Sequence, residues 1–309
     1  MHKSSIPKIV FRITRLNKNF SRRASALTML LSAALLWAAE GKAATVPEAP
    51  PPSRIHGLIN LDVSDHYLTP RGLNVEDQGV IFQPLVLLFF DIYNSDTFIN
   101  NVSLTEGVWN SVHTRRSGAP GQMSHWNEID PISGVSVKFA KDFTLSVTYI
   151  LFNSQNGSFK TSHNLETKLA YNDSKLLGKF ALHPYVTYWR ELHNKDTFAT
   201  TPESYYFEVG IDPSYTFKNF PLTLDAPTYV NLPAHDFYGK SSVIGLFKTE
   251  FRATLPLTCV SKAYGNWSIY GGVKYFKFVN DALVRNGSFA TGKRDTDEIQ
   301  LSGGLNIFF

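Results

Sequence analysis

The alternation of apolar and polar side chains is most regular at the end of the chain. From Ile299 to Phe309 every second residue is apolar or glycine, while the residues between them, such as Gln300 and Asn306, are mostly polar. Because strand side chains point alternately to two faces, this pattern predicts an amphipathic β-strand over 297–309. Such a strand, ending on an aromatic residue, is typical of the closing strand of an outer-membrane barrel. A soluble β-sandwich that ends in the same way is the alternative.

The same pattern predicts eleven further strands upstream. The twelve segments cover 55–65, 79–92, 97–113, 127–140, 142–153, 162–173, 179–190, 204–217, 220–231, 243–256, 266–279 and 297–309. The connections between them alternate between long and short, as the external loops and periplasmic turns of transmembrane barrels do. An even strand count places both termini on the periplasmic side. The sequence therefore predicts an all-β fold, a transmembrane antiparallel up-and-down β-barrel of about twelve strands.

Two segments depart from the simple alternation. Residues 85–90 are apolar on both faces, so the period cannot say which face is turned inward. Glu106 shares a face with the apolar Leu104 and Val108. We interpret Gly107 as the site of a β-bulge that turns this carboxylate inward.

The first 43 residues have the pattern of an export signal. A basic leader precedes an uncharged, Leu- and Ala-rich run from Ala24 to Ala39, and small residues follow at the expected cleavage site. The run is shorter than the ~20 residues of a membrane-spanning helix, which is the alternative interpretation. We therefore predict a signal peptide over 1–43, a Pro-rich periplasmic linker over 44–54 and a barrel over 55–309. The expected location is the outer membrane of a Gram-negative-type bacterium.

Charge and composition change once the leader is removed. The full chain has a formal net charge of +4, but loss of eight of its 30 basic and one of its 26 acidic residues leaves a net charge near −3. No segment of the remaining chain clusters bases with aromatics, which argues against nucleic-acid binding. Aromatic residues make up 14% of the chain, as the interfacial girdles of barrels require. Cys259 is the only cysteine; we interpret it as an incidental thiol in a turn, with intermolecular pairing as the alternative.

A short motif follows the first predicted strand. The segment 64–73 reads SDHYLTPRGL, and Gln83-Pro84 opens the second strand. This arrangement resembles the first loop of the TorF-type porins, in which an Asp-Tyr pair precedes an Arg-Gly. The segment 265–273 (GNWSIYGGV) is similar to the penultimate strand of related, uncharacterised Gram-negative outer-membrane barrels. His66 between Asp65 and Tyr67 is a departure from the motif. The resemblance implies an outer-membrane barrel of unassigned substrate and brings no catalytic residues with it.

The sequence contains few features that would support an enzymatic or metal-dependent function. Its nine histidines include no HExxH motif and no pair at ligand spacing on one face, so we expect no metal and no cofactor. There is no GxSxG motif and no phosphate-binding glycine loop. A lipid-hydrolysing site at the barrel rim stays an alternative, with Ser111 and His113, or less favourably Ser124 and His125, as partners.

The inferred inward face carries more acids than bases. The inward side chains include small residues (Ser136, Ala170, Gly210, Gly272, Ser302) and large ones (Tyr206, Tyr270, Phe276). The candidate pore-lining charges are Asp62, Glu128, Asp130, Lys138, Glu166, Lys168, Glu208, Asp212, Asp225, Lys248, Glu250, Arg252, Lys274 and Glu298. Five of them, Lys248, Glu250, Arg252, Lys274 and Glu298, lie on three consecutive strands and are expected to form a charge ladder. The surplus of acids predicts a narrow pore with a weak preference for cations.

These features together predict a porin-like channel for the passive diffusion of small solutes, and not an enzyme. The alternatives are a barrel enzyme acting on lipids and a plugged structural or surface-interaction barrel. Asp65, Arg71 and Gly72 mark a loop that either folds toward the pore mouth, held by an Arg–carboxylate pair, or forms an ordinary turn after Pro70. The expected partners are outer-membrane lipid and the barrel-assembly machinery, for which Phe309 is the assembly signal. The sequence specifies no oligomeric state.

Overall fold

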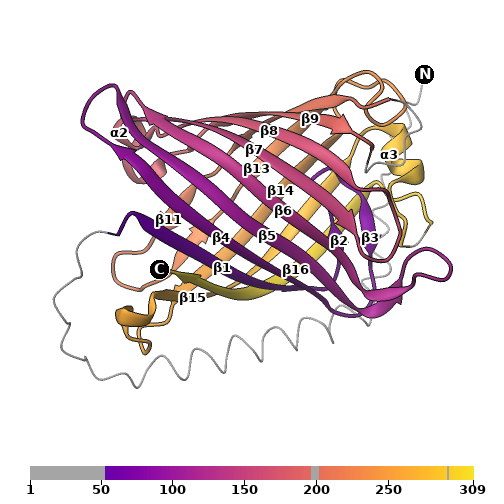
Figure 1. Ribbon diagram of the computed structural model, residues 1–309, viewed down its shortest axis with the longest axis horizontal. Coiled ribbons are helices and arrows are strands. Elements are labelled where there is room, and N and C mark those ends of the chain that lie inside the picture. The colour runs from indigo at the N-terminus through magenta and orange to yellow at the C-terminus, as the bar shows by residue number, and fades with distance from the viewer. Residues whose placement is uncertain (1–52, 196–201, 291) are drawn as a thin grey trace, which may run out of the picture. The chain divides into compact units, whose positions relative to one another are not determined.

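The strands form one closed antiparallel barrel, seen from the side in Figure 1. The computed structural model describes residues 53–195, 202–290 and 292–309. The predicted signal peptide 1–43 and nearly all of the linker 44–54 lie outside these residues. Barrel strands that follow one another in the chain pair in antiparallel fashion, and β1 also pairs with β16, which completes the ring.

The closed ring has twelve strands, as predicted. They are β1 (Ile55–Ser64), β4 (Ile81–Asn94), β5 (Ile99–Ser117), β6 (Ser124–Phe139), β7 (Phe143–Ser154), β8 (Ser162–Tyr171), β9 (Tyr185–His193), β10 with β11 (Tyr205–Ile211, Ser214–Thr216), β12 with β13 (Thr223–Asp225, Thr228–Pro233), β14 (Leu246–Pro256), β15 (Asn266–Phe278) and β16 (Asp297–Phe308). The two interrupted strands break at Pro213 and Pro227, because proline has no N–H to donate to a neighbouring strand. A separate hairpin, β2 (Tyr67–Leu68) with β3 (Asn74–Glu76), lies in the first loop.

The barrel closes where its first strand meets its last. Leu58 pairs with Phe308 and Ser64 with Ser302 in a continuous antiparallel register. Beyond it, the backbones of Gly57 and Phe309 exchange hydrogen bonds of 2.7 and 3.0 Å. The predicted amphipathic strand at the end of the chain is therefore the one that closes the barrel.

The outer face of the barrel is apolar. Large hydrophobic side chains on alternate strand positions are exposed, including Val86 at 37%, Phe251 at 62% and Ile299 at 48%. The positions between them, such as Gln83 and Glu250, are buried inside the barrel. An exposed apolar surface of this kind marks a region that contacts another apolar phase. The structure also shows which side chains of 85–90 point inward, which the sequence alternation could not. Leu85 lines the lumen and Val86 faces outward.

The connections fall at two ends of the barrel. We call the end with 65–80, 118–123, 155–161, 194–204, 234–245 and 279–296 the loop end, and the end with 95–98, 140–142, 172–184, 217–222 and 257–265 the turn end. Figure 1 shows the β2–β3 hairpin and α3 (Asp281–Asn286) at the loop end and α2 (Ser174–Leu177) at the opposite end. Among the described residues, none of the helices is long and apolar enough to cross a bilayer.

The predicted alternation of connection lengths is wrong at two places. The connection 118–123 at the loop end is short, and 172–184 at the turn end is long. The second error arises because β9 begins at Tyr185, whereas the sequence predicted a strand from 179. Residues 174–180 form α2 and a 3₁₀ turn, and the Asp173 carboxylate holds the backbone N–H groups of Leu182 and His183. Pro184 then separates this turn from the strand.

The predicted bulge at Gly107 is also wrong. The register through this part of β5 is continuous, with Glu106 opposite Leu88 on one side and Ser133 on the other. Glu106 therefore stays on the outer face, where its Oε1 accepts a hydrogen bond of 2.7 Å from the Ser133 hydroxyl. The neighbouring strand supplies a polar partner, so the backbone does not need to turn the carboxylate inward.

Candidate functional site in the barrel lumen

The first loop folds into the barrel and does not extend away from its rim. Its tip is a tight turn in which the Gly72 N–H donates to the Thr69 carbonyl over 2.9 Å and the Leu73 N–H to the Thr69 hydroxyl over 3.0 Å. Leu68 and Leu73 are 7% and 2% exposed and join a hydrophobic cluster inside the barrel. Two other loops reach the same cluster, since it includes Phe237, Tyr238, Ala282 and Leu283. These three loops fill part of the lumen at the loop end.

Hydrogen bonds from the wall and from a neighbouring loop fix this inward loop in place. Tyr229 and Tyr238 donate their phenol O–H groups to the carbonyls of Pro70 and Arg71, over 2.9 and 2.8 Å. In addition, the Gln300 amide of β16 donates to the His66 carbonyl over 2.9 Å. The loop is thus held at several points along its length, as a fixed constriction requires.

Arg71 is the most deeply placed charge of the loop. It is 4% exposed, and its guanidinium lies over the rings of Phe152 and Trp189, 4.6 and 5.1 Å from their centroids. Phe152, Trp189 and Tyr206 form an aromatic wall, because each ring lies within 14° of parallel to the next. Cations bind well over such rings. The loop thus folds into the lumen, where Arg71 contacts aromatic rings.

Asp65, the predicted partner of Arg71, contacts the last strand and its own neighbour in the chain. Its Oδ1 accepts the Leu301 N–H over 2.8 Å and lies 2.9 Å from His66 Nδ1. Asp65 therefore joins the start of the loop to β16. Gly72 has a φ of +85°, a conformation that favours glycine, and a side chain there would meet Leu246.

Cavities lie on both sides of Arg71. An outer cavity of about 520 Å³ lies between the first loop and the residues around Gly118 and Gly157. A central cavity of about 390 Å³ lies beneath it, against the aromatic wall and Trp109. Tyr67, Thr69 and Arg71 line both cavities, so these residues form the partition between them.

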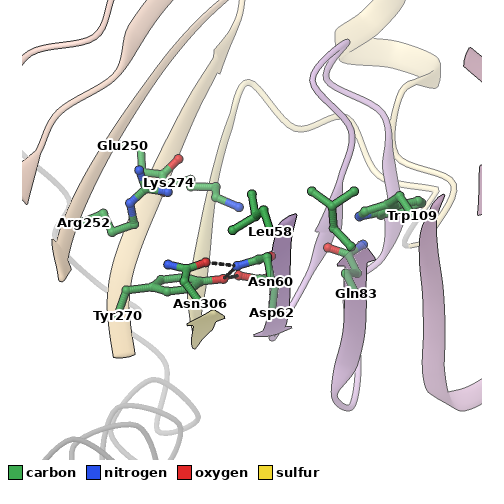
Figure 2. A pocket seen from close by; sticks show the side chains of 11 residues that line it. Leu58, Asn60, Asp62, Gln83, Trp109, Glu250, Arg252, Tyr270, Lys274 and Asn306 are labelled. Carbon is green, nitrogen blue, oxygen red and sulfur yellow. Dashed lines mark hydrogen bonds and ion pairs between the residues drawn. The ribbon is translucent and has the colours of Figure 1, made fainter. Parts of the chain in front are cut away.

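A third, inner cavity continues toward the turn end. It has a volume of about 350 Å³ and shares Gln83, Trp109 and Lys274 with the central cavity. Figure 2 shows its walls, with the polar groups of β1 and β16 facing Arg252 and Lys274. Asn60 donates to Tyr270 and Asn306 over 3.0 and 2.8 Å, and Tyr270 in turn donates to Asp62. The three cavities therefore follow one another along the lumen.

Most of the predicted pore-lining charges face these cavities. Glu128 lines the outer cavity, Asp130, Glu166 and Glu208 the central one, and Asp62, Glu250 and Arg252 the inner one, with Lys274 shared between the last two. Their role in conduction stays a prediction. At the partition, Tyr67 donates a hydrogen bond of 2.6 Å to Glu128. Burial, followed by the charges of Glu128 and Asp130, raises the pKa of Tyr67 well above its usual value, so this phenol stays protonated.

The remaining predicted charges are placed elsewhere. Lys138 and Asp212 are exposed near the turn end, and the Lys168 ammonium lies 3.9 Å from the centroid of the Tyr185 ring. Lys248 lies 3.0 Å from Glu250, and Asp225 lies 3.3 Å from Arg252.

The predicted charge ladder is only partly formed. Glu250 contacts Lys248 and lies 4.0 Å from Arg252, both on its own strand. Glu298 lies outside this group, because its register position is opposite Phe276 and its carboxylate accepts a hydrogen bond of 3.0 Å from Asn74 of the first loop. It therefore helps to anchor the loop. Residue spacing could not show this, because the partner comes from a loop that folds inward.

Sequence reasoning missed the neutral groups of the site. Trp109, Phe152 and Trp189 form much of the central cavity, and Tyr229 and Tyr238 hold the loop. The available signal was the parity of Trp109, Phe152 and Trp189 along their strands, which places each of them on the inward face.

The proposed serine–histidine pair is present but enclosed. Ser111 Oγ and His113 Nε2 are 2.9 Å apart, and the two side chains are 0% and 2% exposed. Tyr67 packs edge-on against the His113 ring, and Gln83 also contacts the Ser111 hydroxyl. Ser124 caps the Trp126 N–H, and His125 contacts the His113 carbonyl. In the described part of the chain, no group of three or more His, Cys, Asp or Glu residues is arranged to hold a metal.

Comparison with known proteins leaves the family open. No family model matches the chain, and no curated protein matches it. Among solved structures, it is similar to the NanC porin (12% identity, TM-score 0.42, covering 80% of this chain and 98% of the other) and to an outer-membrane channel from Pseudomonas putida F1 (12%, 0.43, 86% and 100%). It is also similar to outer membrane phospholipase A from Escherichia coli (11%, 0.43, 89% and 96%). The likeness is one of fold and assigns no residue a role.

Proposed function

We propose that this protein is an outer-membrane channel for the passive diffusion of small solutes. The observation that carries the proposal is the series of three cavities along the lumen, in which neighbouring cavities share lining residues. Tyr67, Thr69 and Arg71 form the partition between the outer and central cavities, because all three line both. Membership of the TorF-type porins is part of the proposal. Its support is the loop motif around Arg71 and Gly72, which lies at this partition.

The outer surface supports a membrane location. Exposed Val, Leu, Ile and Phe side chains surround the strands, while polar and charged groups line the interior. A closed barrel satisfies its strand hydrogen bonds internally, as a membrane-spanning structure must. The outer membrane is the location that fits both the barrel and the predicted export signal.

The lining charges support a weak preference for cations. The carboxylates that face the three cavities outnumber the cations. The carboxylates are Asp62, Glu128, Asp130, Glu166, Glu208 and Glu250, and the cations are Arg71, Arg252 and Lys274. A net negative lumen attracts cations, and salt screens this effect.

Planar-bilayer recording of the purified protein under a salt gradient tests the proposal. We expect a small conductance with a reversal potential of cation sign that weakens at high salt. Arg71→Ala should raise the conductance by opening the partition, whereas Arg115→Ala, which alters an exposed arginine near the loop end, should leave it unchanged. No conductance from the wild type or Arg71→Ala would favour a plugged structural barrel. Lipid hydrolysis by the purified protein would favour the enzymatic alternative.

A further inference from the structure

Most charges that line the central cavity already have partners. Glu208 accepts a hydrogen bond of 2.8 Å from the Tyr185 phenol, and Asp130 accepts one of 3.1 Å from the Asn153 N–H. Arg71 is held over Phe152 and Trp189. Other residues of the protein therefore engage each of these three charges without a solute.

Two opposite charges in the same cavity are not engaged in this way. Within the described residues, neither Glu166 nor Lys274 takes part in a hydrogen bond or an ion pair, although both line the central cavity. Lys274 lies opposite Glu250 in the strand register, but Glu250 is already engaged by Lys248. Figure 2 shows Lys274 extending from its strand into the space between the walls.

The two side chains come from well-separated parts of the ring. Glu166 is on β8 and Lys274 on β15, with β9, β10, β13 and β14 between them along the wall. One carboxylate and one ammonium therefore face the same space of about 390 Å³ from different sides. Lys168 acts on Glu166, and Lys274 acts on Asp62 and Glu250, but without a direct hydrogen bond or ion pair. Leaving a charge without a direct partner in a confined site is costly, so a solute that contacts both groups would complete the pairing.

We propose that the central cavity binds a small zwitterion, such as an amino acid or a short peptide. The ammonium of the solute pairs with Glu166 and its carboxylate pairs with Lys274, while the aromatic wall of Phe152, Trp189 and Tyr206 contacts its side chain. A simple cation would pair with Glu166 but would be repelled by Lys274. A simple anion would pair with Lys274 but would be repelled by Glu166. This inference rests on the proposed function, because the solute reaches the cavity along the lumen.

Solute entry into liposomes separates this inference from the proposed function. Glutamine and arabinose are the probes, because they have similar mass and no net charge, but only glutamine has separated charges. With wild-type barrel we expect glutamine to enter several-fold faster than arabinose. Glu166→Gln and Lys274→Gln should remove this difference while arabinose entry continues. Lys160→Gln is the control, because Lys160 is exposed in the connection just before β8 and does not line the central cavity.

Binding to the folded barrel in detergent gives a second readout that does not need conduction. Glutamine is titrated while the intrinsic tryptophan fluorescence, to which Trp109 and Trp189 beside the cavity contribute, is followed. Glu166→Gln and Lys274→Gln should each weaken binding about tenfold, the contribution of a hydrogen bond to a charged group. Reversed charges in the double variant Glu166→Lys with Lys274→Glu should restore binding that Glu166→Lys alone abolishes.

Three outcomes would be decisive. Equal entry of glutamine and arabinose through a conducting wild-type barrel would overturn the zwitterion site and leave the channel standing. Glutamine binding in detergent without conductance or solute entry would overturn the channel and leave the site standing. Variants that keep the preference for glutamine at wild-type level would overturn the assignment to Glu166 and Lys274.

Discussion

At the scale of single residues, the lumen is divided by side chains whose roles depend on contacts distant in sequence. Arg71 separates two cavities because Phe152 and Trp189, from two other strands, offer it flat ring faces. Its predicted partner, Asp65, contacts β16. The residue types around Arg71 indicated an unusual loop. Their arrangement depends on which strands lie beside the inward loop, and periodicity carries no such information.

Gly72 is the residue on which the fit of the inward loop depends most directly. A Cβ at this position would lie 2.7 Å from Leu246 and 3.0 Å from Phe278, at a φ of +85°. Gly72→Ala should lower the free energy of unfolding by about 2 to 3 kcal/mol, as left-handed strain and overpacking combine. Gly121→Ala is the matched control, because Gly121 has the same φ of +85° but open space around it, and should cost about 1 kcal/mol. Denaturant midpoints of the folded barrels measure both; equal losses would contradict the crowding argument.

At the scale of elements, alternation predicted the strands well because it reflects two different solvents. One face of each strand meets an apolar phase and the other a polar lumen, so the period of two is visible along most of the chain. The prediction failed where another constraint decided the backbone. Residues 174–180 form helical turns at a place where alternation suggested the start of a strand. Glu106 kept its outward position because Ser133 hydrogen-bonds to it.

The seam between β1 and β16 tolerates little extra volume. A Cβ added at Gly304 would lie 2.3 Å from the Leu61 carbonyl oxygen and 2.7 Å from the Tyr270 hydroxyl. Gly304→Ala should therefore weaken closure and reduce the fraction of protein that shows heat-modifiable mobility on a gel. Ser302→Ala, on the same buried face of β16, adds no atoms and should behave as wild type. A Gly304→Ala barrel that closes as fully as wild type would show that the two strands can separate at no cost.

The long turn 172–184 depends on one carboxylate. Burial alone would raise the pKa of Asp173, but hydrogen bonds from the His183 and Leu182 N–H groups outweigh it and hold the pKa below its usual value. The ionised Asp173 carboxylate stabilises the turn fully at pH values above its ordinary pKa of about 3.9. This stabilisation is lost as the pH falls through the lowered pKa. Asp173→Ala should therefore increase proteolysis within 174–183 at neutral pH. In the wild type, the hydrogen-exchange protection of Leu182 and His183, relative to the intrinsic exchange rate at each pH, should fall only at strongly acidic pH; a loss of protection near neutrality would contradict this account.

At the scale of the whole molecule, closure and strand number could be predicted, but the filling of the lumen could not. The strand count follows from the alternation of apolar and polar residues along each segment. Closure of the barrel follows from the even number of strands and from their apolar outer face. The inward loops depend instead on a hydrophobic cluster whose members, such as Leu73, Phe237 and Leu283, come from three separate connections. Each of them reads locally as an ordinary loop residue. Only the assembled barrel shows that they share one core.

The orientation of the barrel in the membrane can be tested with its own single cysteine. Cys259 is a free, exposed thiol in the turn 257–265, at the turn end. If this end faces the periplasm, a membrane-impermeant maleimide should leave Cys259 unlabelled in intact cells and label it once the outer membrane is permeabilised. In a Cys259→Ser background, Ala119→Cys and Lys240→Cys should react in intact cells, because both positions lie in connections at the loop end. Labelling of Cys259 in intact cells, together with protection of both loop positions, would invert the topology. The outer cavity and Arg71 would then face the periplasm, so solutes would meet the partition last and not first.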